Sequence, residues 1–91
     1  MAMTESADFV LINRLGLHAR AAAQLVQTAN RFKADVTVAK DGEEVNGKSI
    51  MGLLMLAAPV GSLLRVTVSG DDAAEAMQAI GALINDGFGE R

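Results

Sequence analysis

The segment NRLGLHARAA, residues 13–22, contains the only histidine of this 91-residue chain, His18. The apolar run at 8–12 before it predicts a β-strand, and the alanine-rich run that starts at Ala19 predicts a helix. His18 therefore lies where a strand passes into a helix. The first turn of a helix has unpaired backbone N–H groups and the positive end of the helix dipole. An imidazole beside such an end, with Arg20 two residues further on, can hold a phosphoryl group.

The composition limits the classes of protein that fit. A chain of this length forms one small domain, here expected over 1–91, and its core must be aliphatic because 51% of the residues are hydrophobic and only three are aromatic. The absence of cysteine excludes disulfides and thiolate metal sites, and no metal site or cofactor is indicated. A net charge of −3 argues against a general nucleic-acid binder. No signal peptide or membrane-spanning stretch is visible, so we expect a soluble cytoplasmic monomer without a membrane partner.

The hydrophobic periodicity predicts the element order β-α-β-β-α-β-α. Strands are expected at 8–12, 35–39, 43–45 and 64–68, and helices at 19–32, 50–58 and from 73 to a stop near Gly87, with residues 1–7 frayed. Each helix has one apolar stripe and two of the longer strands alternate. This pattern favours an α+β domain in which the helices cover one face of a four-stranded, mostly antiparallel sheet.

The chemistry expected at His18 follows from its position. The helix end and the Arg20 guanidinium both disfavour an imidazolium, so the ring is expected to be neutral and nucleophilic. Once phosphorylated, the same groups would bind the new negative charge. No residue is poised as a general base to activate water, which favours a carrier over a hydrolase. The residue types alone leave a structural histidine at a strand–helix junction as an open alternative.

A second motif lies in the predicted hairpin and the segment that follows it. Residues 42–49, GEEVNGKS, match the nucleotide-binding P-loop pattern letter for letter. We reject this interpretation because Gly42 belongs to a predicted hairpin turn, Glu43 and Glu44 would repel phosphates, and the helix that follows is short. Ser49 is expected instead to be the N-cap of that helix.

The helix after Ser49 is apolar on nearly all sides. A helix that packs on one face can bury only part of such a surface, so the sequence leaves open whether these residues are core or an exposed patch. They are Ile50, Met51, Leu53, Leu54, Met55 and Leu56.

With these motifs in view, the chain resembles the histidine-containing phosphocarrier proteins (HPr) of the phosphotransferase system. The resemblance covers nearly the whole chain and is carried by residues 13–20 (NRLGLHAR), the Asp41-Gly42 hairpin, residues 45–52 (VNGKSIMG) and Gly70-Asp71-Asp72 before the last helix. It implies an open-faced β-sandwich of four strands and three helices.

The resemblance also implies a function. His18 would accept a phosphoryl group on Nδ1 from phosphorylated enzyme I, with phosphoenolpyruvate as the source, and pass it to an enzyme IIA-type protein. Arg20 would stabilise the phosphate. The chain would be a phosphoryl carrier and not an independent enzyme.

The resemblance extends to regulation and docking. In some HPr-like proteins the serine that matches Ser49 is phosphorylated by an HPr kinase/phosphorylase. The residues expected to dock partners are Ala19, Ala23, Lys48, Ile50, Met51 and Leu54. An adaptable Met/Leu surface suits a carrier that binds several proteins weakly.

One departure bears on the branch of the system. Many members have proline directly after the arginine, where this chain has Ala21. This substitution and the Gly87-Phe88 ending are more similar to members found in regulatory, nitrogen-type chains than to those of sugar uptake. A regulatory binding module of the same fold, switched by phosphorylation, is the alternative function.

Overall fold

The structure is a computed structural model that describes residues 3–90. Its elements are β1 (Met3–Val10), α1 (Ala19–Ala29), β2 (Asp35–Lys40), β3 (Glu43–Asn46), α2 (Ile50–Met55), β4 (Leu63–Gly70), α3 (Ala73–Asn85) and a short 3-10 helix, η1 (Gly87–Gly89). The strands form one antiparallel sheet in the order β1-β4-β2-β3. The predicted open-faced α+β architecture is therefore confirmed.

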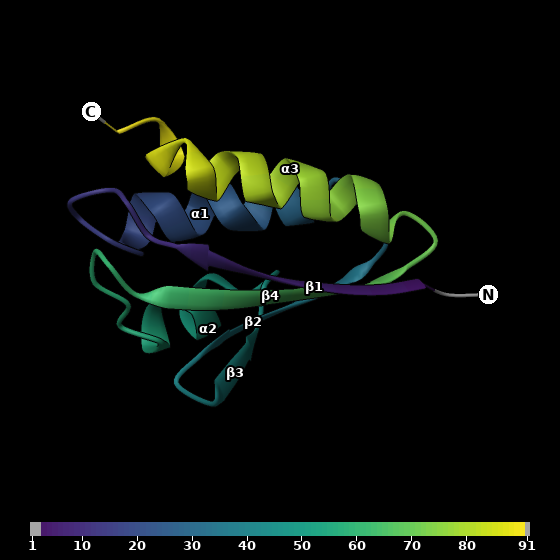
Figure 1. The fold of residues 1–91 in the computed structure, drawn as a ribbon, viewed down its shortest axis with the longest axis horizontal. Helices are drawn as coiled ribbons and strands as arrows, with labels where there is room; N and C mark the ends of the chain where they lie inside the picture. Colours follow the sequence, from purple (N-terminus) through teal and green to yellow (C-terminus); the bar gives the residue numbers. More distant parts are fainter. Residues whose placement is uncertain (1–2, 91) are drawn as a thin grey trace.

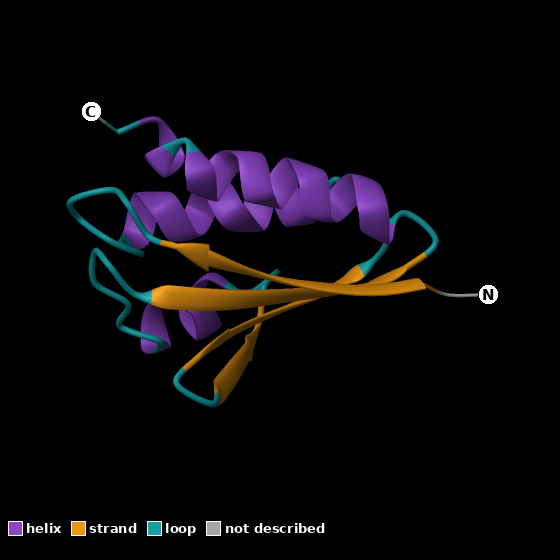
Figure 2. Cartoon of the chain, in the orientation of Figure 1, coloured by secondary structure: helices purple, strands orange, loops and turns teal. Residues whose placement is uncertain are grey.

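The helices and the sheet form two layers (Figure 1, Figure 2). α3 lies over β1 and β4 with α1 at its side, and α2 contacts α1 and β3 at the other edge of the sheet. Between the layers is an aliphatic core, whose largest fully buried side chains are Leu11, Leu25, Leu53, Leu64, Ile80, Ile84, Val38, Val66 and Val68. The open face is mostly polar, with Thr4 and Ser6 of β1 paired through their hydroxyls with Ser69 and Thr67 of β4.

The expectation that residues 1–7 are frayed is wrong for residues 3–7. β1 pairs with β4 along its whole length, from Met3 opposite Gly70 to Val10 opposite Leu63. The start of the strand alternates polar side chains toward the open face, and so it lacks the apolar run by which strands are recognised. Residues 1 and 2 lie outside the described residues.

Two helices are shorter than predicted. α1 ends at Ala29 with Asn30 as its C-cap, so Phe32 lies beyond the helix. α2 ends at Met55, because the chain turns at Ala57, which has a left-handed φ of 48°, before it reaches Pro59. No helix within residues 3–90 is long and apolar enough to cross a bilayer.

The ends of α3 follow the sequence prediction more closely. Gly87 adopts a φ of 63° just after the helix, as expected for a glycine stop. Asp72 is the N-cap residue, but its carboxylate does not bond the first turn of α3. It accepts the backbone N–H groups of Lys33 and Ala34, each at 2.9 Å, and so ties the start of β2 to the start of α3.

Candidate functional site

His18 is the N-cap of α1, as the sequence predicts. Its backbone is extended, and its carbonyl oxygen accepts the first helical hydrogen bond from Ala22 N at 2.8 Å. The ring Nδ1 accepts the backbone N–H of Arg20 at 3.3 Å. The side chain is 26% exposed. The imidazole therefore lies at the helix end and reaches solvent, and it is not packed into the interior.

The loop before His18 is braced by a second loop. Leu17 N donates to Ala58 O at 2.9 Å, and Leu11 N donates to Ser62 O at 2.9 Å. Gly16 lies against this second loop with a φ of +65°, and a β-carbon at that position would lie 2.4 Å from Ala58 O. Only glycine meets both conditions, so Gly16 fixes the approach of the chain to His18.

One residue of the site, Glu90, carries no signal in the sequence that predicts its role. Its Oε2 is hydrogen-bonded to His18 Nε2, and its Oε1 accepts a hydrogen bond from Asn13 Nδ2 at 3.2 Å. Asn13 is only 4% exposed, and its Nδ2 also donates to Gly16 O at 2.7 Å. Because Nδ1 of the ring is an acceptor, the ring proton resides on Nε2 and is donated to Glu90.

The electrostatics of Glu90 reflect these contacts. The hydrogen bond from His18 lowers the pKa of the Glu90 carboxyl; partial burial opposes this, and Asn13 and the positive charge of Arg20 reinforce it. The carboxylate is therefore charged at neutral pH while it holds the ring.

One cavity joins these groups on the surface. It is lined by Ile12, Asn13, Arg14, Leu15, His18, Arg20 and Glu90. Arg14 and Arg20 are exposed, so two guanidinium groups border the pocket into which the imidazole opens. Such a setting suits an anionic group on the ring. Among residues 3–90, no three His, Cys, Asp or Glu side chains are grouped so that they could hold a metal ion.

Ser49 caps α2, as predicted. Its Oγ accepts the Gly52 N–H at 3.0 Å. The neighbouring Lys48 donates from Nζ to Phe32 O at 2.8 Å. Its ammonium group therefore links the segment before α2 to the segment after α1.

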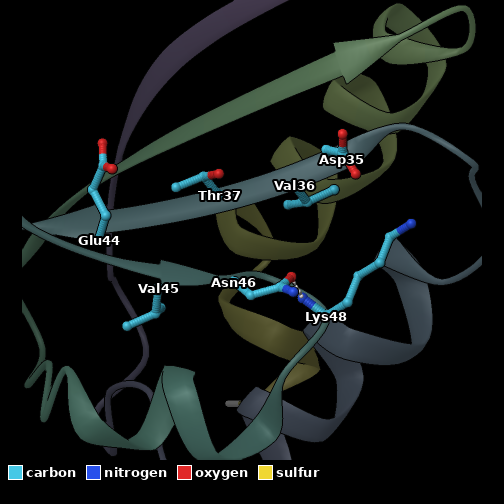
Figure 3. Close-up of a pocket in the computed structure, with 7 residues that line it drawn as sticks. All are labelled: Asp35, Val36, Thr37, Glu44, Val45, Asn46 and Lys48. Atoms are coloured by element: carbon cyan, nitrogen blue, oxygen red, sulfur yellow. Dashed lines mark hydrogen bonds between the residues drawn. The ribbon is translucent and has the colours of Figure 1, made fainter.

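The P-loop interpretation of residues 42–49 does not fit the backbone. Gly42 lies in the hairpin turn, and Glu43–Asn46 is the edge strand β3. Figure 3 shows the pocket along this strand, in which Asp35 and Thr37 of β2 lie across from residues of β3. Glu44 adds a second carboxylate to Asp35 there, which disfavours a bound phosphate.

The docking residues predicted on α2 are at the surface. Met51 is 72% exposed, Ile50 and Leu54 are 42% and 37% exposed, and Leu53 faces the core. α2 therefore divides between core and surface. On α1, which contacts α2, Ala19 is exposed and Ala23 half-buried. The residues Ala19, Ala23, Ile50, Met51 and Leu54 are called the apolar patch below.

Comparisons with known proteins agree on one family. The family model described as "PTS HPr component phosphorylation site" matches residues 5–86. A phosphocarrier protein HPr of Neisseria meningitidis is 55% identical over 80 residues, which cover 88% of this chain and 90% of that protein. The HPr-like protein Crh of Halalkalibacterium halodurans is 49% identical over 71 residues, 78% of this chain and 84% of that protein. Among solved structures, HPr-C-His from Thermoanaerobacter tengcongensis superposes with a TM-score of 0.92 at 41% identity, covering 96% of this chain and 98% of that one. The chain therefore belongs to the HPr family of phosphocarrier proteins of the phosphotransferase system.

Proposed function

We propose that Nδ1 of His18 accepts a phosphoryl group from phosphorylated enzyme I, with phosphoenolpyruvate as the first donor, and passes it to an enzyme IIA-type protein in the cytoplasm. The observation that carries this proposal is that the two nitrogens of the His18 ring have different hydrogen-bond partners. Nε2 is occupied by Glu90, whereas Nδ1 lies at the start of α1, where among residues 3–90 its one partner is the Arg20 N–H. The nitrogen with the available lone pair is thus beside the backbone donors that can receive a phosphate.

Arg20 is proposed to stabilise the phosphate. Its backbone N–H already donates to Nδ1, and the residue lines the same cavity. When Nδ1 carries a phosphoryl group, that N–H can donate to a phosphoryl oxygen, and the guanidinium can add charge-assisted hydrogen bonds. Neutralisation of the charge would stabilise the phosphorylated carrier without hydrolysing it.

The apolar patch is proposed to dock enzyme I and the enzyme IIA-type acceptor. Its exposed Met and Leu side chains are unbranched at the β-carbon and adapt to different partners. Lys48 is a weaker candidate for this role than the sequence suggested, because its ammonium already bonds Phe32 O.

Ser49 is proposed as a regulatory phosphorylation site for an HPr kinase/phosphorylase. The side chain is half-buried, and its hydroxyl holds the first turn of α2. A phosphoryl group there would bring about two negative charges next to the apolar patch. Partners that approach with acidic groups would be repelled.

A regulatory binding module remains a second candidate function, because the similarity to Crh is nearly as extensive as that to HPr. Under that function, the phosphorylation state of His18 or Ser49 would control the docking of a target. A chain that takes no phosphate from enzyme I, but binds a target only when phosphorylated on Ser49, would favour it.

The test is a phosphorylation assay with enzyme I and labelled phosphoenolpyruvate, followed by location of the phosphate by residue and acid stability. Wild type is expected to take up one acid-labile phosphoryl group. His18→Ala should stay folded and take up none, and Arg20→Ala should react more slowly. Arg31→Ala is the matched control, because it removes the same charge just beyond the other end of α1. Acid-labile label on His18→Ala would refute the assignment of the acceptor.

A further inference from the structure

We propose that Glu90 is a positioning residue for phosphoryl transfer: it holds the Nε2–H of His18, aims Nδ1 at the donor, and stabilises the positive charge that the ring gains during transfer. This inference rests on the proposed function of His18. It concerns a segment outside the match to the family model, which ends at residue 86.

The backbone between α3 and Glu90 is shaped to make this contact. Gly87, Phe88 and Gly89 follow one another with left-handed φ values of 63°, 57° and 73°. This conformation is unfavourable for phenylalanine, and Phe88 is held in it by burial, since its side chain is only 3% exposed. The reversal carries Glu90 back over the start of α1, although it lies 72 positions from His18 in sequence.

The carboxylate is itself fixed. Its side chain is 19% exposed, and the buried Asn13 holds its other oxygen while also holding Gly16 O. Asn13 therefore links the glycine turn, Glu90 and, through Glu90, the imidazole. A freely rotating surface glutamate would lose most of its effect to solvent and side-chain entropy. The arrangement resembles the carboxylate that orients histidine in hydrolytic triads.

The charge balance of the transfer explains why a carboxylate is useful here. The Nδ1 lone pair forms a bond to phosphorus, and the bond from phosphorus to the donor atom breaks with its electron pair left on the donor. Nε2 keeps its proton, so the His18 ring becomes cationic as the phosphoryl group arrives. Glu90, in contact with that Nε2–H, stabilises this charge. In onward transfer the electron pair of the N–P bond returns to the ring, which leaves as neutral imidazole.

The other charged groups near the ring act in the opposite sense or make no contact with it. Arg14 and Arg20 border the same cavity and disfavour a cationic ring. Asp86, at the end of α3, borders an adjoining pocket with Glu90, but its carboxylate makes no hydrogen bond or ion pair within residues 3–90. Asp86 therefore offers a matched control that removes one negative charge nearby.

The experiment compares wild type, Glu90→Gln and Asp86→Asn by rapid-quench phosphorylation with phosphorylated enzyme I. Phospho-His18 hydrolysis is then followed across the neutral pH range. Glu90→Gln should be phosphorylated about tenfold more slowly, as the charged acceptor becomes a neutral one. Gln holds the Nε2 proton of phospho-His18 less well than Glu does. As the pH rises, the hydrolysis rate of phospho-His18 should therefore begin to fall at a lower pH in Glu90→Gln than in wild type. Asp86→Asn should match wild type in both measurements.

The outcomes separate this inference from the proposed function. If wild type itself takes no label, the proposed function fails. If wild type is labelled and Glu90→Gln reacts equally fast, or reacts slowly with an unshifted hydrolysis profile, the role of Glu90 is overturned while that of His18 stands. Nitrogen-15 NMR of the wild-type ring gives a check that needs no variant: the proton must reside on Nε2, and a proton on Nδ1 would contradict the inference.

Discussion

Replacing Gly16 with alanine should destabilise the domain through two separate effects. The residue has a φ of +65°, and a left-handed conformation costs a non-glycine residue about 1–2 kcal/mol. The added β-carbon would also lie 2.4 Å from Ala58 O and 2.9 Å from the α-carbon of Pro59. Both contacts are to backbone, so relief requires the two loops to separate, which for an overpacked site costs about 1–3 kcal/mol more. The total is about 2–5 kcal/mol.

Gly61→Ala separates these two effects. Gly61 has a φ of +89°, but a β-carbon there has no atom within 4 Å. It should therefore show only the conformational cost of about 1–2 kcal/mol, or roughly 4–16 °C in Tm for a domain of this size. Urea denaturation of both variants gives the difference directly. Equal losses of stability for Gly16→Ala and Gly61→Ala would refute the proposed clamp between the His18 loop and the loop at Ala58.

Gly16→Ala should also impair phosphorylation beyond its effect on stability. Gly16 O is one of the two acceptors that hold Asn13 Nδ2, and Asn13 holds Glu90. If the loops separate, this network loosens and the imidazole loses its orientation. The initial rate of labelling should therefore fall in Gly16→Ala under conditions where it is fully folded, whereas Gly61→Ala should label at the wild-type rate.

Three further predictions follow from other parts of the structure. Hydrogen bonds from the backbone N–H groups of Lys33 and Ala34 lower the pKa of Asp72 in the folded protein below its ordinary value of 3.8. The Asp72 carboxylate therefore stabilises the fold at pH values above 3.8, and this stabilisation is lost as the pH falls through the lowered pKa of the folded state. Asp72→Asn should therefore lower the urea midpoint at neutral pH. It should also make the urea midpoints at neutral pH and at about pH 3 more alike than they are in wild type, whereas Asp71→Asn, the control, should do neither. Ser49→Asp should retain the α2 cap but slow phosphorylation by enzyme I, whereas Ser49→Ala should lose about 1 kcal/mol of stability and keep its rate; a wild-type rate for Ser49→Asp would rule out electrostatic control. Met51→Glu should change stability by no more than about 0.5 kcal/mol and raise the apparent KM for phosphorylated enzyme I, with Met3→Glu, exposed at the far end of β1, as the control.

Local signals in the sequence were sufficient to predict His18 at the start of α1 and Ser49 at the start of α2. In both cases a polar side chain comes just before an apolar run of helical period, and the capping contact spans only two or three residues. The glycine stop at Gly87 is a signal of the same kind. The fold class followed because the elements alternate in an order that leaves few ways to bury the apolar stripes.

Predictions failed where a residue's environment comes from a distant part of the chain. The polar start of β1 gains its order from hydroxyl contacts to β4, more than 60 positions away. Asp72 directly precedes α3 and is its N-cap residue, yet its carboxylate accepts backbone N–H groups just before β2. In each case the competing partner is fixed by tertiary packing, which local propensity does not contain.

Glu90 is the clearest case of an environment set by a distant part of the chain, because no single residue between the end of α3 and Glu90 predicts its contact with His18. Gly87 predicts a stop, Phe88 an apolar anchor, and a glutamate near the end of the described chain predicts only a solvated charge. Together, three left-handed residues with a buried aromatic at their centre turn the chain back over α1, and a buried asparagine receives the carboxylate. The strain at Phe88 argues that this reversal serves a purpose, because a relaxed ending would avoid it. The contact it maintains is to Nε2, the imidazole nitrogen that is not the proposed phosphoryl acceptor.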